Sequence, residues 1–244
     1  MSTAPALPAA TEVLVVGAGP VGLTAALLLA ELGVDVVLVE RRDGPQRAPA
    51  AHVTNARTFE VWRQAGVDLD RLLAYALSPA EGGEVHWVTS FGGEIIGSLP
   101  FEQQGDDVLA LTPTPLRNLS QHHIEPHLRD EVEVRGVPVR YGHRWLGAEQ
   151  HGDSVTSPIE GPDGLRHEVT ARWLLACDGA GSPVRRSAGI EPIGPHHLQT
   201  FLMVHLLGDL GAVQGDRPGV LHWVCDPRAA GTFIAHDVHR EWVF

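Results

Sequence analysis

The sequence contains no lysine: all 18 basic residues in its 244 positions are arginine. This absence excludes chemistries that depend on a lysine side chain, including a P-loop lysine, a Schiff base and a lysine general base. Arginine instead suits anions held by planar, bidentate contacts, such as phosphates. Any phosphate group that the chain binds is therefore expected to meet arginine side chains or backbone amides.

Cysteine and net positive charge are lacking as well. Cys177 and Cys225 are the only cysteines, too few for a disulfide framework or a zinc knuckle, and they indicate nothing beyond a reducing compartment. The net charge of −12 argues against a nucleic-acid partner, because such partners require a basic surface. The length predicts roughly one to two domains with a sizeable core.

Targeting and membrane signals are also missing from the sequence. Residues 1–10 have neither the basic start nor the long apolar core of a signal peptide, so we expect a flexible tail there. The apolar stretch from Val21 to Val39 is interrupted by Glu31, Gly33 and Asp35, which argues against a membrane span. We therefore expect a cytoplasmic protein with no membrane partner.

The most informative motif lies near the N-terminus, where residues 13–22 read VLVVGAGPVG. An apolar strand leads into the glycines, a helix of small residues follows, and a second apolar run ends at Glu40. Gly17 allows the tight turn, Gly19 lets backbone amides approach a pyrophosphate, and Gly22 lets the helix pack close to the strand. Glu40 lies where a carboxylate can accept a hydrogen bond from a ribose hydroxyl. Together these features predict a dinucleotide site at the helix N-terminus.

The rest of the chain alternates between helical and strand-like patterns. Helices are expected at 54–65 and 68–76, a hairpin around Phe91-Gly92-Gly93, and another helix starting near Gln121 with Ser120 as its N-cap, because Pro126 fits only near a helix start. Further strands are expected in four stretches that look like a β-meander, namely 138–141, 144–150, 154–160 and 165–170. An apolar strand then ends at Cys177-Asp178-Gly179 before a helix, and the region beyond Gly194 is expected to be strand-like with no clear helix.

Three segments together resemble the class A flavoprotein monooxygenases, the FAD-dependent aromatic hydroxylases related to p-hydroxybenzoate and phenol hydroxylases. They are VLVVGAGPVGLTAALLLAELGVDVVLVER, QRAPAAHVTNARTFEVWRQAGV and LLACDGAGSPVR, and a fourth stretch, SQHHIEPHL, is similar to the family's Q-x-x-[LI]-E-x-x-L. The resemblance runs through the whole chain but covers only the first half of such a protein. It implies an α/β fold with a Rossmann-like FAD-binding domain (11–76 and 112–190) interleaved with an incomplete β-rich substrate domain (77–111 and 191–244).

The resemblance also implies cofactors and site residues. FAD is the expected cofactor and NAD(P)H the co-substrate, and the expected reaction is the hydroxylation by O₂ of an aromatic or polyketide-like substrate. Arg47 is expected to approach the flavin's phosphate and ring region, Gln121 to lie against the FAD, and Asp178 to help bind both FAD and the nicotinamide coenzyme. No catalytic acid or base is nominated, since the cofactor carries the chemistry in this family. The expected cofactor-binding set is Gly17, Gly19, Pro20, Gly22, Glu40, Arg41, Arg47, Gln121 and Asp178.

One segment of the family pattern is missing. None of the chain's Gly-Asp pairs is followed by the small-small-His pattern of the family's later FAD-gripping segment. We therefore expect a fragment, or a split or degenerate product, whose incomplete sheet favours a homodimer or a complementing chain. Two rival functions stay open: a catalytically incomplete flavin- or nucleotide-binding protein, and a flavin oxidoreductase of the same fold that does not use O₂.

Other residues are given structural interpretations. Arg41 is expected near the adenosine end of the cofactor. Arg117 is expected to reach either a phosphate or the surface. Arg57 and Arg63 are expected to pair with carboxylates such as Glu60. The 14 histidines do not predict a metal site, because the adjacent pairs His122-His123 and His196-His197 should diverge and no HExxH motif occurs. Core packing is favoured over a substrate pocket for four aromatic residues, and over a reactive thiol for Cys177. The four aromatic residues are Trp87, Phe91, Trp223 and Phe233.

Overall fold

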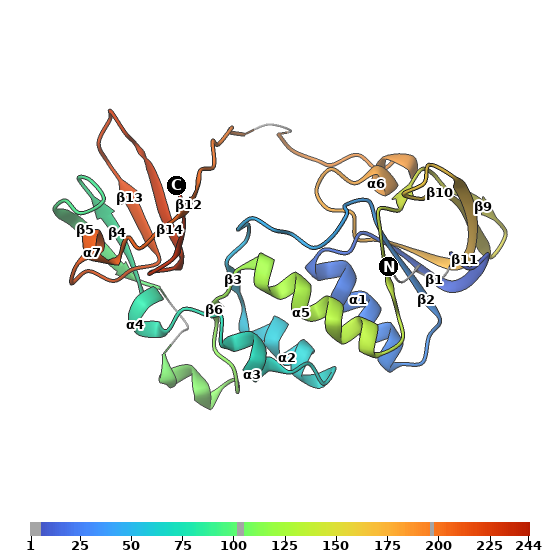
Figure 1. The fold of residues 1–244 in the computed structure, drawn as a ribbon, viewed down its shortest axis with the longest axis horizontal. Coiled ribbons are helices and arrows are strands. Elements are labelled where there is room, and N and C mark those ends of the chain that lie inside the picture. The colour runs from blue at the N-terminus through green and yellow to red at the C-terminus, as the bar shows by residue number, and fades with distance from the viewer. Residues whose placement is uncertain (1–5, 102–104, 196–197) are drawn as a thin grey trace. The chain divides into compact units, whose positions relative to one another are not determined.

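The computed structural model describes residues 6–101, 105–195 and 198–244, which fall into two compact units (Figure 1). Unit 1 is drawn from Met1–Gln46 and Glu125–Leu198, and unit 2 from Arg47–Ile124 and Gln199–Phe244. The chain therefore crosses between the units three times. The FAD-binding and substrate-binding limits predicted from the sequence concern function, and they stay a prediction.

Unit 1 is built on a seven-stranded sheet with the order β7-β2-β1-β11-β10-β8, in which β9 also pairs with β10. Strands β7, β2, β1 and β11 run parallel, and β10 is antiparallel to β11. Its elements are β1 (Ala10–Val16), α1 (Pro20–Glu31), β2 (Val36–Glu40), α5 (Gln121–Val134, whose first residues belong to unit 2), β7 (Val139–Tyr141), β8 (Arg144–Trp145), β9 (Glu149–His151), β10 (Ser154–Glu160), β11 (Arg166–Ala176) and α6 (Pro183–Ser187).

The core of unit 1 explains why these residues form parallel strands. All five residues of β2 are buried, and its run VVLVE is typical of a strand covered on both faces. Gly22, Leu23, Ala26 and Leu27 form the buried side of α1. Packing begins before β1, since Leu7 packs against this core and the Ala9 carbonyl accepts the backbone N–H of Thr170; residues 1–5 of the expected tail lie outside the described residues.

Two expectations for the strands of unit 1 are wrong. Strand β7 does not belong to a meander, because it pairs in parallel with β2. The two strands expected at 165–170 and before Cys177 are one continuous strand, β11. The continuity has a physical reason: the first part of β11 pairs with β10 and the last part with β1, so both halves have hydrogen-bonded neighbours.

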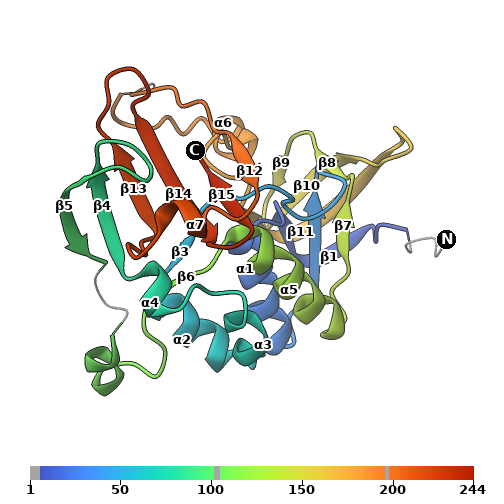
Figure 2. The same ribbon diagram turned by 60° about the vertical axis from the view of Figure 1, so that its left-hand side comes forward.

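Unit 2 contains a six-stranded sheet with the order β12-β15-β14-β13-β4-β5 and a two-stranded sheet formed by β3 and β6 (Figure 2). Its other elements are short helices. The elements are β3 (Val53–Thr54), α2 (Ala56–Gln64), α3 (Leu69–Leu73), α4 (Pro79–Gly82), β4 (Glu84–Val88), β5 (Ile95–Pro100), the 3₁₀ helix η1 (Asp106–Ala110), β6 (Arg117–Asn118), β12 (His205–Leu207), α7 (Gly211–Gln214), β13 (Leu221–Val224), β14 (Gly231–Asp237) and β15 (Glu241–Val243).

Most local predictions for unit 2 are confirmed. The helices α2 and α3 begin after capping side chains, Asn55 and Asp68, and β4 and β5 form the expected hairpin. Helix α5 begins at Gln121, and the Ser120 carbonyl accepts the backbone N–H of Ile124, as an N-cap residue does. The expectation of no helix beyond Gly194 is wrong, because α7 forms a single short turn there.

The large sheet of unit 2 joins two distant parts of the sequence. Strand β13 pairs in parallel with β4, so residues 84–88 and 221–224 share one ladder. Beneath it lies a core around Trp242, which is fully buried with Leu77, Val220 and Ala235. The α/β fold with an added β-rich sheet is confirmed. Within the described parts of the chain, no helix is both long enough and apolar enough to cross a membrane.

Candidate functional site

The glycine-rich turn of unit 1 has the geometry that its sequence predicts. Gly17 adopts φ +103°, a conformation that favours glycine, and a Cβ there would overlap the carbonyl of Cys177. A Cβ on Gly22 would overlap the carbonyl of Gly17. Both positions therefore require glycine for the fold itself, because the turn, α1 and the end of β11 lie against one another.

Gly19 differs, because a Cβ placed there would not clash with any neighbour. It is the N-cap of α1, and the nearest atom to a Cβ placed there would be Oε1 of Glu125 at 3.9 Å. Pro20 is the first helical residue, no side chain caps the helix, and its first turn contains no acidic residue. The first amides of α1 thus present unpaired N–H groups and positive dipole beside a residue that has no side chain to cover them. This arrangement fits a pyrophosphate.

Glu40 lies at the end of β2 and is buried, with its carboxylate directed at the same turn. Its Oε2 accepts the backbone N–H of Ala18 at 2.8 Å, and its Oε1 accepts the backbone N–H of Arg42 at 2.9 Å and the Arg42 Nε at 3.2 Å. A carboxylate has about four acceptor positions. A ribose hydroxyl would therefore share Glu40 with the turn and with Arg42, and the predicted ribose contact stays a prediction.

Arg42 extends this network to a second carboxylate. Its Nη2 donates to Glu125 at 3.2 Å, and Glu125 also accepts the backbone N–H of Gln46 at 2.6 Å. The Glu125 side chain is fully buried. Burial lowers the pKa of Arg42, but the charges of Glu125 and Glu40 outweigh this effect, so the pKa lies above its ordinary value. The guanidinium therefore stays charged between two carboxylates.

Sequence reasoning assigned no role to Arg42 or Glu125. The signal for Glu125 was present, since it is the acidic position of the Q-x-x-[LI]-E-x-x-L pattern, which drew attention to Gln121 alone. Arg42 stands in an arginine-rich loop, where nothing local distinguishes it from Arg41, whose side chain is exposed. The two residues are 83 positions apart, so only the fold reveals their contact.

Asp178 follows the end of β11 and is tied to the next helix. Its Oδ2 accepts the backbone N–H of Val184, in α6, at 2.9 Å. Burial and then the charge of Asp178 raise the pKa of the Cys177 thiol, which argues against a reactive thiolate. Asp178 also lies beside the glycine-rich turn, because a Cβ on Gly17 would be 3.0 Å from the Asp178 Cα. Its predicted cofactor contact stays a prediction.

Two other predicted residues, Arg47 and Gln121, belong to unit 2. The Arg47 side chain is exposed, at the start of the loop that leads to β3. Backbone bonds join this loop to the start of α5: Gln121 donates to the Ala51 carbonyl at 2.8 Å, and Leu119 donates to the His52 carbonyl at 2.7 Å. The structure therefore brings together the two segments that carry these residues.

The other three arginines singled out in the sequence, Arg57, Arg63 and Arg117, each bond a neighbouring group. Arg57 pairs with Glu60 at 3.2 Å, as predicted. Arg63 donates to the Thr114 hydroxyl at 2.7 Å, so its predicted pairing with Glu60 is replaced by a bond to the loop before β6. Arg117 Nη1 donates to the Leu116 carbonyl at 3.0 Å.

The four aromatic residues divide between the two faces of the large sheet of unit 2. Trp223 is paired with Trp87, and His222 with His86, so the tryptophans share one face and the histidines the other. Phe91 and Phe233 pack together in the core with a ring separation of 4.4 Å, as expected. The core assignment is wrong for Trp223, which is 46% exposed. The sheet thus presents two tryptophans on its open face.

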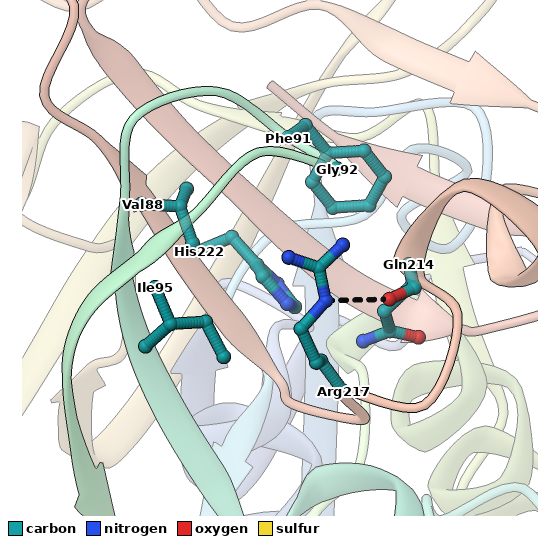
Figure 3. A pocket seen from close by; sticks show the side chains of 7 residues that line it. All are labelled: Val88, Phe91, Gly92, Ile95, Gln214, Arg217 and His222. Atoms are coloured by element: carbon teal, nitrogen blue, oxygen red, sulfur yellow. Dashed lines mark hydrogen bonds between the residues drawn. The ribbon is translucent and has the colours of Figure 1, made fainter.

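The core side of this sheet holds a small pocket beneath the β4–β5 hairpin (Figure 3). Arg217 Nε donates to the Gln214 carbonyl at 3.3 Å, and neither ring nitrogen of His222 has a hydrogen-bond partner among the described residues. Burial, followed by the neighbouring His86, lowers the pKa of His222 to about 4. The pocket encloses about 190 Å³ even with the space open to solvent, less than the roughly 300 Å³ of the smallest usual ligand pockets. We assign no cofactor to it.

A histidine cluster in unit 2 is formed by His52, His122, His123, His205 and His236. The rings of His122 and His123 are 4.0 Å apart, so the expectation that their side chains diverge is wrong. Both residues lie in the first turn of α5. The His123 ring stacks on Tyr75, and His122 Nε2 lies 3.0 Å from Glu241 Oε2. Burial, followed by four neighbouring histidines, lowers the pKa of His236 to about 3. The other pair, His196 and His197, lies outside the described residues.

Comparison with protein families identifies residues 10–244 as a match to the FAD binding domain family. Two curated relatives illustrate the similarity. A 2,4-dichlorophenol 6-monooxygenase from Delftia acidovorans is 33% identical over 225 residues, which cover 89% of this chain and 38% of the relative. The aklavinone 12-hydroxylase RdmE from Streptomyces purpurascens is 36% identical over 233 residues, covering 91% of this chain and 43% of the relative.

Solved structures agree with the sequence relatives. The flavin-dependent monooxygenase PieE, in complex with FAD and substrate, superposes with a TM-score of 0.89 at 31% identity, over 98% of this chain and 43% of that one. A ternary complex of aklavinone-11 hydroxylase with FAD and aklavinone gives a TM-score of 0.81 at 33% identity, over 96% and 45%. The chain spans less than half the length of these relatives.

Proposed function

Since the chain belongs to the FAD-binding domain family of the phenol and polyketide hydroxylases, we propose that it binds FAD and serves an NAD(P)H-dependent hydroxylation of an aromatic, polyketide-like substrate. The observation that carries the proposal is the uncapped N-terminus of α1 at Gly19, where no side chain covers the backbone. A backbone site of this kind needs no lysine and suits a pyrophosphate.

Each predicted residue has a task in this proposal. Gly19 and Pro20 admit the pyrophosphate to the amides of α1, while Gly17 and Gly22 hold the turn close to β11. Glu40 accepts a ribose hydroxyl, and Arg41 lies near the adenosine. Arg47 and Gln121 contact the flavin, and Asp178 contacts FAD and the nicotinamide coenzyme. Arg42 and Glu125, added by the structure, act as positioning residues that fix the Glu40 carboxylate and the loop at Gln46.

The open face of the large sheet in unit 2 supports the proposed substrate class. Trp87 and Trp223 are side by side there, and Trp223 is 46% exposed, a surface suited to stacking against a planar aromatic ring. When bound, FAD would supply the redox chemistry, in which NAD(P)H would be the hydride donor and O₂ the source of one oxygen atom for the ring and one for water. The protein's task is to bind, orient and exclude water.

The decisive experiment is the visible absorption spectrum of the purified chain, incubated with FAD and then desalted. We expect a retained flavin band that is lost in Gly19→Val and kept in Gly147→Ala, a control position with nothing within 4 Å of an added Cβ. NAD(P)H oxidation that depends on an added phenol, with a hydroxylated product, would complete the proposal.

The other outcomes separate the rival functions. Retained flavin without turnover would indicate a flavin-binding protein. Reduction of another acceptor without phenol would indicate an oxidoreductase that does not use O₂. If the folded chain retains no flavin, or if Gly19→Val retains it as well as the natural chain does, the proposed pyrophosphate site is wrong.

A further inference from the structure

The histidine cluster of unit 2 contains a set of ligand atoms that the proposed FAD chemistry does not use. His122 and His123 lie in the first turn of α5, and Glu241 begins β15. One nitrogen of each imidazole and one carboxylate oxygen all lie within 4.8 Å of one another. We propose that these three side chains form a binding site for a divalent transition metal ion such as Zn²⁺.

The ligand types and spacings match such an ion. Two imidazoles and one carboxylate are a set found at open zinc sites, where a fourth position is left for water or a substrate oxygen. Zinc lies about 2.0–2.2 Å from such nitrogen and oxygen atoms, so two ligands of a tetrahedral site are about 3.3 Å apart. His122 Nε2 and Glu241 Oε2 are already 3.0 Å apart. The third ligand, His123, has a nitrogen within 4.8 Å of both of these atoms, so binding an ion would draw this side chain inward.

The surrounding residues hold the ligands in place. His205 Nε2 lies 2.8 Å from the other carboxylate oxygen, Oε1 of Glu241, and this contact orients the carboxylate. Tyr75 stacks on the His123 ring with a centroid separation of 4.5 Å and an interplanar angle of 13°. Partners that orient the ligands in this way are typical of metal centres.

The burial of the proposed ligands is a further indication. The side chains of His122 and Glu241 are only 11% and 13% exposed. A simple surface ion pair would not require this burial, whereas a bound ion offsets the cost of keeping imidazole and carboxylate groups out of water.

Two other histidine–carboxylate pairs in the described residues are exposed. His239 and Asp209 are 3.4 Å apart with side chains 70% and 57% exposed, and His151 and Glu149 are 3.6 Å apart and also exposed. Neither pair has a second histidine within reach of the same site, since His122, His123 and Glu241 form the group of three among these residues. His239 and His151 thus provide matched controls.

The test uses the tag-free chain, stripped of metal with a chelator and then titrated with ZnCl₂ by calorimetry. We expect one equivalent of Zn²⁺ to bind, with an affinity reduced by more than about a hundredfold in His122→Ala and in Glu241→Gln. His239→Ala should bind as the natural chain does. Glu241→Gln keeps the side-chain shape, so it tests the site even if His122→Ala fails to fold, and circular dichroism reports the folding of each variant.

A second readout is the visible spectrum of the Co²⁺-loaded chain, which reports coordination geometry directly. An intense tetrahedral spectrum that disappears in Glu241→Gln supports the site. The absence of Zn²⁺ binding would overturn the proposal, as would binding that His239→Ala weakens as much as Glu241→Gln does. This proposal does not depend on FAD binding, so the failure of either leaves the other intact.

Discussion

Arg42 donates from Nη2 to the fully buried carboxylate of Glu125 at 3.2 Å, and the same guanidinium contacts Glu40. The contact joins the loop after β2 to α5, two segments that are distant in sequence. Glu125 in turn lies beside Gly19, since its Oε1 would be the nearest atom to an added Cβ, at 3.9 Å. The buried charge and the candidate pyrophosphate site are thus parts of one arrangement.

Replacing Arg42 with methionine should leave Glu125 buried without its cation. We expect the free energy of unfolding to fall by about 2 kcal/mol, less than for a fully buried pair because Arg42 is one-third exposed. Urea unfolding measures the change. Adding Glu125→Gln should recover part of the loss, since the stranded charge is then removed. Equal stability of Arg42→Met and the natural chain would contradict the structural role given to this pair.

Gly22→Ala tests the contact between α1 and the glycine-rich turn. The added Cβ would overlap the carbonyl of Gly17, so the helix must shift. We expect the free energy of unfolding to fall by at least about 1–3 kcal/mol. Guanidinium unfolding should show this loss for Gly22→Ala but little change for Gly147→Ala, whose added Cβ meets nothing within 4 Å. Similar stability of the two variants would mean that the close packing is not required.

Gly19→Ala, unlike Gly22→Ala, is expected to leave stability nearly unchanged and to weaken FAD binding. An added Cβ at position 19 meets no atom nearer than 3.9 Å, so stability should change by less than about 1 kcal/mol. Affinity for FAD should nevertheless fall at least about tenfold, because the methyl group occupies the space assigned to the pyrophosphate. Calorimetry with FAD, alongside unfolding curves, separates the two effects. Loss of stability without loss of affinity would exclude the assignment.

His222 predicts how stability depends on pH. Its pKa is about 4 in the folded chain, against 6.5 for an unperturbed histidine. Between these values the unfolded chain binds a proton that the folded chain excludes, so stability is complete above pH 6.5 and falls as the pH falls toward 4. In His222→Asn the slope of unfolding free energy against pH should decrease by about one proton in this window. The exposed His151→Asn should keep the natural slope.

Trp223→Ala tests the open sheet face. Trp223 is 46% exposed, so its removal should cost little stability, but affinity for a hydroxylated anthraquinone in the presence of FAD should fall at least about tenfold. Trp173→Ala is the matched control, because Trp173 is 61% exposed and lies on β11 in unit 1. Calorimetric titration measures both variants. An equal effect of the two substitutions would indicate nonspecific binding to exposed tryptophan.

The features that could be predicted from the sequence are those fixed by nearby residues. The turn from Gly17 to Gly22, the caps at Asn55 and Asp68, and the start of α5 at Gln121 depend on local backbone chemistry. The burial of Glu40 follows from its position at the end of a fully buried strand. Local rules therefore recovered the turn around which the candidate site is built.

The features that were missed depend on contacts distant in sequence. Neither Arg42 with Glu125 nor His122 with Glu241 can be paired by spacing, since each contact crosses between separate elements. The register of β13 on β4 places Trp223 on the outward face beside Trp87, and the register of β14 on β13 places Phe233 on the inward face beside His222. A shift of one residue would exchange the faces. Sequence patterns identified these residue types but not their partners.

The double pairing of β11 has a consequence for how the protein is made. Strand β1 pairs in parallel with β2 on one side, but its neighbour on the other side is β11, where Val13 pairs with Trp173, and all of β2 through β10 is synthesised between β1 and β11. During synthesis on the ribosome, the apolar residues of β1 and β2 therefore stay uncovered until most of the chain has been made. Such long-range parallel pairing folds slowly and exposes the nascent chain to aggregation. We therefore expect the yield of folded protein to depend on chaperones and on low growth temperature.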